Sequence, residues 1–154
     1  MLRIDAHQHF WQFNPYRDSW ITEEMAVIQR DFLPDELQPI LQSNGFDGCV
    51  LVQSSQPENE NEFLLEHAQQ HDFIKAVVGW VDFLADDVEE RLAYYKLFPK
   101  LKGFRYVLQG NPDKAIMLRP EFKRGIGLLQ QHGYTYDILI YPCLLYTSPS
   151  PRDS

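Results

Sequence analysis

Apolar positions along this chain recur with two different spacings, one typical of strands and one typical of helices. Continuous apolar runs of strand length are typical of strands that are buried on both faces of a sheet. They lie at residues 46–53, 76–81, 101–107 and 136–141, after a shorter strand within residues 3–10. Segments with helical spacing or helix end signals separate them, at residues 34–43, 58–71, 86–97 and 119–132. The pattern therefore predicts an α/β chain of repeated strand–helix units.

Such alternation favours parallel strands that are joined by right-handed crossovers. Pro34 suits a first helical turn, and Asn44-Gly45 suits a left-handed helix stop. Two architectures fit this order of elements, a doubly wound open sheet and a (β/α)₈ barrel. No glycine-rich phosphate loop follows the first strand, and the candidate chemistry lies at the carboxyl end of that strand. Both observations favour the barrel.

Two histidines near the start of the chain are the first candidates for chemistry. In a strand, side chains alternate between the two faces, so Asp5, His7 and His9 are predicted to share one face. Two imidazoles at this spacing can each bring a nitrogen to about 2.0–2.1 Å from one cation, with Asp5 orienting a ring from behind. The alternative is a strand end with two partly exposed histidines that bind nothing. An acid two residues before the pair, at the end of an apolar strand, favours a metal or catalytic site.

A long polar and aromatic segment, residues 11–32, follows this strand. Loops of this length within a compact domain are usually functional or disordered. Phe13, Tyr16 and Trp20 argue against disorder, so the segment is predicted to form a lid or a pocket wall. The alternative is a loop that only packs over the sheet.

Composition narrows the classes of function. The chain has 154 residues, is 44% apolar and carries a net charge of −8, which favours one soluble domain and disfavours nucleic acid as a partner. No apolar run approaches the roughly 20 residues that span a bilayer, and no secretory signal is recognisable, so no membrane partner is expected. Cys49 and Cys143 form no disulfide framework. These features predict a cytoplasmic protein.

The last twelve residues differ in character from the rest. Residues Cys143–Asp153 have neither strand nor helix periodicity, and the run resembles a translated sequencing-adapter sequence. We therefore expect residues 1–142 to be the native part, cut inside or just after the fifth strand, and residues 143–154 to be a non-native tail. The alternative is a genuine Ser/Pro-rich linker.

The stretch from Asp5 to Trp11, Asp-Ala-His-Gln-His-Phe-Trp, resembles the amidohydrolase superfamily. Within it the similarity is greatest to the amidohydrolase 2 group, which includes sugar-acid lactonases of the fucono- and rhamnono-lactonase types. Four further segments share the resemblance: Val-Leu-Val-Gln at 50–53, Val-Gly-Trp-Val-Asp at 78–82, Lys-Gly-Phe-Arg-Tyr at 102–106 with a glutamine at 109, and Tyr-Asp-Ile-Leu-Ile-Tyr-Pro at 136–142. The resemblance implies that residues 1–142 are the N-terminal part, about five βα units, of a truncated TIM (β/α)₈ barrel.

The resemblance also implies a chemistry. It suggests hydrolysis of a lactone by an activated water, with a small-molecule substrate and a divalent metal, zinc, that some members do without. His7 and His9 match the first-strand histidines, which implies catalytic and metal-binding roles for both. Arg105 matches a position suited to binding substrate oxygens, for which a guanidinium is well shaped. The alternative for Arg105 is an ion pair with an acid of the barrel.

The family also uses a later histidine and a late-strand aspartate, and residues 1–142 offer no matching positions. Asp82, Asp137 and His132 are not assigned to these roles, and His67 and His71 are expected on the surface without a site. The 154-residue chain is therefore predicted to be an inactive, open half-barrel whose first and fifth strands each lack a neighbour. Two alternatives stay open: a decarboxylase of the same superfamily, and a non-catalytic fragment with weak metal or ligand binding. The sequence does not indicate the oligomeric state.

Overall fold

Five parallel strands form one sheet in the computed structural model, which describes residues 1–56 and 58–142. The strands follow one another in chain order across the sheet: β1 (Ile4–Gln8), β2 (Gly48–Val52), β3 (Ile74–Gly79), β4 (Leu101–Val107) and β5 (Thr135–Leu139). Sequential order with parallel pairing confirms the predicted α/β class and the repeated strand–helix units. The expected non-native tail, residues 143–154, lies outside the described residues.

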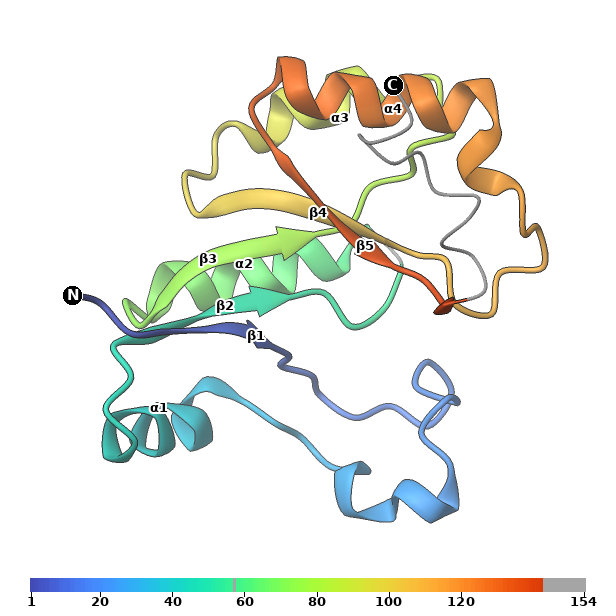
Figure 1. Cartoon of the computed structure of the whole chain (residues 1–154). Helices are drawn as coiled ribbons and strands as arrows, with labels where there is room; N and C mark the ends of the chain where they lie inside the picture. Colours follow the sequence, from blue (N-terminus) through green and yellow to red (C-terminus); the bar gives the residue numbers. More distant parts are fainter. Residues whose placement is uncertain (57, 143–154) are drawn as a thin grey trace.

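Four α-helices connect the strands and surround the curled sheet (Figure 1). They are α1 (Pro34–Ser43), α2 (Glu60–Gln70), α3 (Val88–Tyr95) and α4 (Pro120–Gln131), with short 3-10 helices at Glu23–Ile28 and Ile116–Leu118. Pro34 occupies the first turn of α1, and Gly45 and Gly133 follow α1 and α4 with φ of 72° and 66°. Pro34 and Gly45 are the end signals that the sequence predicts for α1, and Gly133 ends α4 in the same way, because only glycine enters that backbone region without strain.

No helix in the described part of the chain is both long and apolar enough to cross a bilayer.

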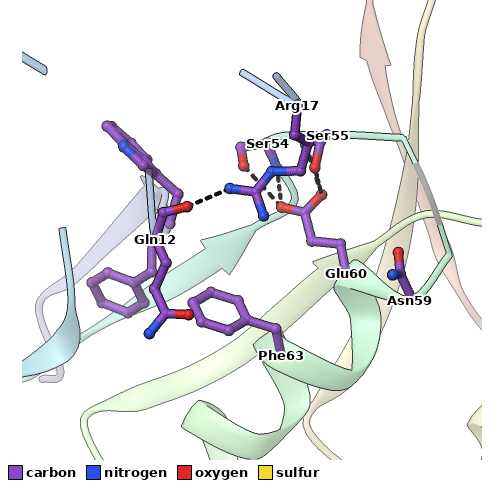
Figure 2. A pocket seen from close by; sticks show the side chains of 9 residues that line it. Gln12, Arg17, Ser54, Ser55, Asn59, Glu60 and Phe63 are labelled. Atoms are coloured by element: carbon purple, nitrogen blue, oxygen red, sulfur yellow. Dashed lines mark hydrogen bonds between the residues drawn. The ribbon is translucent and has the colours of Figure 1, made fainter. Parts of the chain in front are cut away.

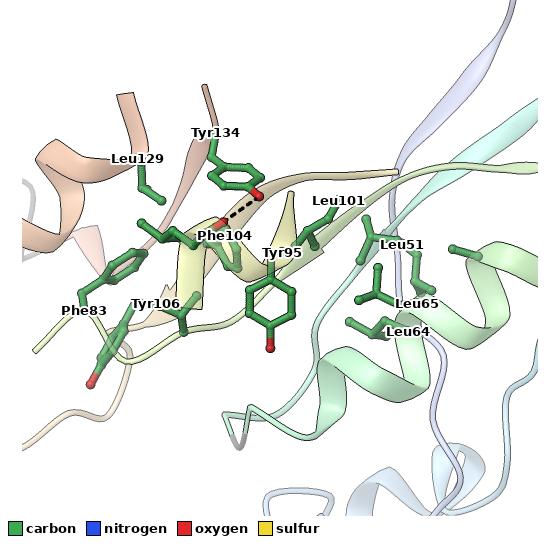
Figure 3. Packing of buried hydrophobic residues seen from close by; sticks show 14 of the residues in the cluster. Leu51, Leu64, Leu65, Phe83, Tyr95, Leu101, Phe104, Tyr106, Leu129 and Tyr134 are labelled. Carbon is green, nitrogen blue, oxygen red and sulfur yellow. Dashed lines mark hydrogen bonds between the residues drawn. The ribbon is translucent and has the colours of Figure 1, made fainter. Parts of the chain in front are cut away.

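The core lies between the sheet and the helices and combines aliphatic side chains with aromatic rings that pack against one another (Figure 3). Phe104 of β4 is fully buried, with its ring centroid 5.7 Å from that of Tyr95 and 5.0 Å from that of Tyr134. The Tyr134 hydroxyl donates a hydrogen bond of 3.1 Å to the main-chain carbonyl of Leu92. Burial of such large rings supplies much of the free energy that holds helices to a sheet.

One buried amide fixes the carboxyl end of β3. The Asn61 Nδ2 donates to the Trp80 carbonyl at 2.7 Å and to the Tyr95 hydroxyl at 2.9 Å, while its Oδ1 accepts from the Trp80 N–H at 2.9 Å. Asn61 itself is fully buried in α2. This side chain therefore ties two helices to the edge of the sheet at which the candidate site lies.

Candidate active site

His7 and His9 converge at the carboxyl end of β1. Their Nε2 atoms lie 3.1 Å apart, and the rings meet edge to face with centroids 4.8 Å apart. The His9 Nδ1 lies 2.8 Å from the main-chain carbonyl oxygen of Val52, which only an N–H can satisfy. The neutral His9 ring therefore keeps its lone pair on Nε2, the atom that faces His7. Burial lowers the pKa of His9 to about 4, so this ring is neutral at pH 7.

Asp5 does not orient either ring, which corrects the prediction made from the Asp-x-His-x-His pattern. Its Oδ1 accepts a hydrogen bond from the His7 main-chain N–H at 3.1 Å, and its Oδ2 accepts from the Gln8 side-chain amide. The register between β1 and β2 shifts between Asp5 and Gln8, so strict alternation of faces is lost there. The Val52 carbonyl performs the orienting role for His9, and a main-chain group leaves no signal in the sequence.

Arg105 of β4 joins the histidine pair across the sheet. Its guanidinium is buried, and Nη1 lies 3.3 Å from the His7 Nε2. None of the ion pairs found within residues 1–56 and 58–142 includes Arg105, so the alternative of an ion pair with a barrel acid finds no partner in this part of the barrel. The side chain of Gln53 contacts the guanidinium instead, and sequence reasoning had assigned no role to this residue.

The side chains of His7, His9 and Arg105 line an open cavity of about 760 Å³. The strand ends contribute Val107, Gln109, Leu139 and Tyr141 to it, and the loops contribute Trp11, Arg17, Trp20, Ser54, Ser55 and Gln56. Three of these loop residues come from the segment 11–32, which therefore forms a wall of the cavity, as its aromatic content predicts. An isolated antiparallel β-bridge between Trp11 and Phe32 joins the two ends of this segment just before α1.

Two sets of polar contacts hold the loops of this wall. At the start of α2, the Glu60 carboxylate accepts hydrogen bonds of 2.6–2.8 Å from the main-chain N–H and the hydroxyl of both Ser54 and Ser55 (Figure 2). Arg17 donates to the carboxylate of buried Asp18 at 2.8 Å and to the carbonyl of Gln12. Four hydrogen bonds to one carboxylate fix the β2–α2 loop beside the cavity.

The family follows from a direct match. Residues 4–149 match the family model described as amidohydrolase. The chain belongs to the amidohydrolase family. It is 40% identical to an L-fucono-1,5-lactonase of Burkholderia multivorans over 141 residues, which are 91% of this chain and 47% of that protein. An L-fucono-1,5-lactonase of Burkholderia ambifaria is 36% identical over 92% of this chain and 49% of its own length.

A crystal structure of an amidohydrolase from Burkholderia multivorans superposes on the chain with a TM-score of 0.90 at 39% identity. It aligns with 96% of this chain and 51% of its own, and a second crystal form with bound zinc has a TM-score of 0.91. The likeness confirms the predicted fold, the N-terminal part of a TIM-barrel amidohydrolase. The chain spans about half the length of the relatives it matches.

Other ionisable residues of this amidohydrolase chain lie apart from the histidine pair or lack ligand geometry. No group of three or more His, Cys, Asp or Glu side chains placed to hold a metal occurs within the described residues. His67 and His71, expected on the surface, are half-buried, and His67 meets Phe63 edge to face at 4.5 Å. The Asp82 Oδ1 accepts a hydrogen bond from the main-chain N–H of Leu84. Asp137 lies opposite Arg105 in the β4–β5 register without forming an ion pair.

Proposed function

We propose that the amidohydrolase to which this chain belongs hydrolyses a sugar-acid lactone. The observation that carries the proposal is the convergence of His7, His9 and Arg105 on one cavity at the carboxyl ends of parallel strands, where barrel enzymes hold their active sites. The named lactonases that share 36–40% of its residues support the substrate class. The cavity is large enough for a small cyclic ester, which fits a small-molecule substrate.

The histidine pair suits a divalent metal, and we propose zinc. Two ligands of one zinc ion lie within about 4.2 Å of each other, since each Zn–N bond is about 2.0–2.1 Å, and the two Nε2 atoms are 3.1 Å apart. His9 presents a lone pair because its Nδ1 donates to Val52, and imidazole nitrogen is a preferred zinc ligand. When bound, zinc polarises a substrate carbonyl and lowers the pKa of a coordinated water.

The side chains of the chain itself would bind and orient the lactone. Arg105 points a guanidinium N–H into the cavity, where it would donate to an ester oxygen and stabilise the negative charge that develops on it. Trp11 and Trp20 form an apolar wall against which a sugar-derived ring would lie and which would limit access of water. With a pKa of about 4, the His9 ring is uncharged at neutral pH and does not serve as a general acid.

Lactone hydrolysis by matched variants tests the proposal. The chain would be joined to the C-terminal half of the Burkholderia multivorans lactonase, and acid release from L-fucono-1,5-lactone would be followed against the spontaneous rate. We expect hydrolysis by the joined protein, a loss of about 100-fold or more in His7→Ala and Arg105→Met, and little change in His132→Gln. Hydrolysis that survives His7→Ala would contradict the site, and carbon dioxide release from a carboxylated substrate without hydrolysis would favour a decarboxylase.

The 154-residue chain alone is proposed to be inactive and to bind zinc weakly, because its described part offers two ligands where a catalytic zinc has about three. Calorimetric titration with Zn²⁺ measures this. Tight one-to-one binding that His7→Ala abolishes would show that two ligands suffice, and the expected weakness would be wrong.

A further inference from the structure

Arg105 is a buried charge that forms no ion pair within the described part of the chain. The residue is 6% exposed, and the ion pairs found there involve other side chains. Buried charges are normally paired, because removing an ion from water is expensive unless a counter-charge replaces the water. Asp137 and Glu60 act on Arg105 only through longer-range attraction. Among the described residues, the guanidinium therefore lines the cavity without a counter-charge in contact with it.

Gln53 takes the place in which an acid would be expected. Its Oε1 accepts hydrogen bonds from the Arg105 Nε at 3.1 Å and Nη2 at 2.6 Å, and its main-chain carbonyl also accepts from Nη2. Gln53 is fully buried and stands behind the guanidinium, outside the cavity lining. These contacts occupy one edge of the planar group, whereas Nη1 faces His7 and the cavity.

A glutamine and a glutamate have almost the same shape, and both could hold this edge of the guanidinium. Only the amide holds it without neutralising its charge. We propose that Gln53 is a positioning residue that fixes Arg105 while leaving its positive charge available to an anion in the cavity. The anion is an oxygen anion derived from the lactone, either the carboxylate of the sugar acid or the oxyanion that forms on the carbonyl oxygen during hydrolysis. This inference rests on the proposed function only for the identity of the anion.

An available positive charge on Arg105 should make the site bind an anion more tightly than a neutral molecule of similar shape. A fixed, un-neutralised guanidinium interacts more strongly with the oxyanion or the carboxylate than with the neutral lactone, which is the condition for catalysis by differential binding. The same preference predicts that the sugar acid binds more tightly than a neutral polyol of equal size.

The experiment uses the 154-residue chain and its Gln53→Glu and Gln53→Met variants, with Gln70→Glu as a control. Gln70 is exposed at the end of α2, so its variant adds the same charge away from the cavity. The Arg105 Nε–H signal, assigned with Arg105→Lys, reports by NMR whether the guanidinium is held. Titration with L-fuconate, and with the neutral polyol L-fucitol, reports anion binding at that signal.

We expect a slowly exchanging Arg105 Nε–H in the wild type that L-fuconate shifts and L-fucitol does not. Gln53→Met should lose the protection. Gln53→Glu should keep it but bind L-fuconate about tenfold or more weakly, and Gln70→Glu should match the wild type. A freely exchanging Arg105 in the wild type would overturn the positioning role. Equal L-fuconate affinity in Gln53→Glu, or no response of the wild type to L-fuconate, would overturn the reservation of charge. If these results are obtained but the joined protein does not hydrolyse the lactone, only the proposed function would be wrong.

Discussion

Strands β4 and β5 lie side by side in an unbroken parallel register, from Gly103 opposite Thr135 to Val107 opposite Leu139, yet their surroundings differ. Most of β4 is buried, whereas no residue of β5 is. Phe104 is fully buried, but Ile138, two residues beyond Tyr136, the β5 residue opposite Phe104, is 57% exposed. The two strands are similarly apolar in sequence, so apolar character alone does not set burial.

The difference comes from neighbours. β4 pairs with a strand on each side, while β5 pairs only with β4 among the described residues. Met117, Phe122 and Ile126 leave an apolar groove of about 400 Å³ beside Tyr136 and Ile138. A sheet edge of this kind offers unpaired main-chain groups and apolar surface, which natural sheets usually cover. The fold thus concentrates its stability in its middle strands and leaves β5 weakly held.

The largest effect should separate Phe104 from Ile138. Phe104→Ala is expected to lower the free energy of unfolding by about 3–5 kcal/mol, because it opens a cavity among Tyr95, Tyr134 and the sheet. Ile138→Ala should change it by less than about 1 kcal/mol, since over half of that side chain is already in water. Urea denaturation of the two variants, followed by tryptophan fluorescence, measures both. Equal losses would show that β5 is covered in solution.

Strand β1 lies at the other edge of the sheet, and a buried residue next to it should make stability depend on pH. His9, just after β1, has a pKa of about 4 in the folded chain against about 6.5 when unfolded, owing to burial. As pH falls through 6.5, His9 takes up a proton in the unfolded chain but not in the folded chain. The stability present at pH 7 is therefore lost between about pH 6.5 and pH 4. The loss should reach at most about 3 kcal/mol in metal-free protein.

Denaturation at pH 7 and pH 4.5 in the presence of a chelator checks this, with His9→Asn and His132→Gln as the matched pair. The drop in stability should shrink in His9→Asn and persist in His132→Gln. An identical drop in the wild type, His9→Asn and His132→Gln would show that another group titrates. His9 would then be exposed to solvent in the folded chain.

These contrasts also show where sequence reasoning succeeds. The order of strands and helices could be predicted because apolar spacing and residues such as Pro34, Gly45 and Gly133 act locally. The convergence of the histidine pair could be predicted because both residues lie at one strand end. The side chain of Gln53 on Arg105 spans 52 residues of chain, and no local pattern announces it. The Val52 carbonyl on His9 is a main-chain group, which any residue could supply.

The smallest expected effect on the free energy of unfolding concerns two glycines of α4. Gly125 lies on the packed side of the helix and Gly127 on its open side. A Cβ built on Gly125 would lie 2.5 Å from the main-chain oxygen of Phe83, whereas one on Gly127 would meet nothing within 4 Å. Alanine is better than glycine within a helix by about 0.5–1 kcal/mol, chiefly because it restricts the unfolded chain. Gly127→Ala should therefore raise the free energy of unfolding by that amount. Gly125→Ala should lower it, because the backbone of Phe83 cannot give way as a flexible side chain could. Thermal melts of both variants, compared at equal protein concentration, measure the pair. If Gly127→Ala destabilised the chain as Gly125→Ala does, the groove beside Ile138 would be filled in solution, and the contrast between β4 and β5 would not describe the protein.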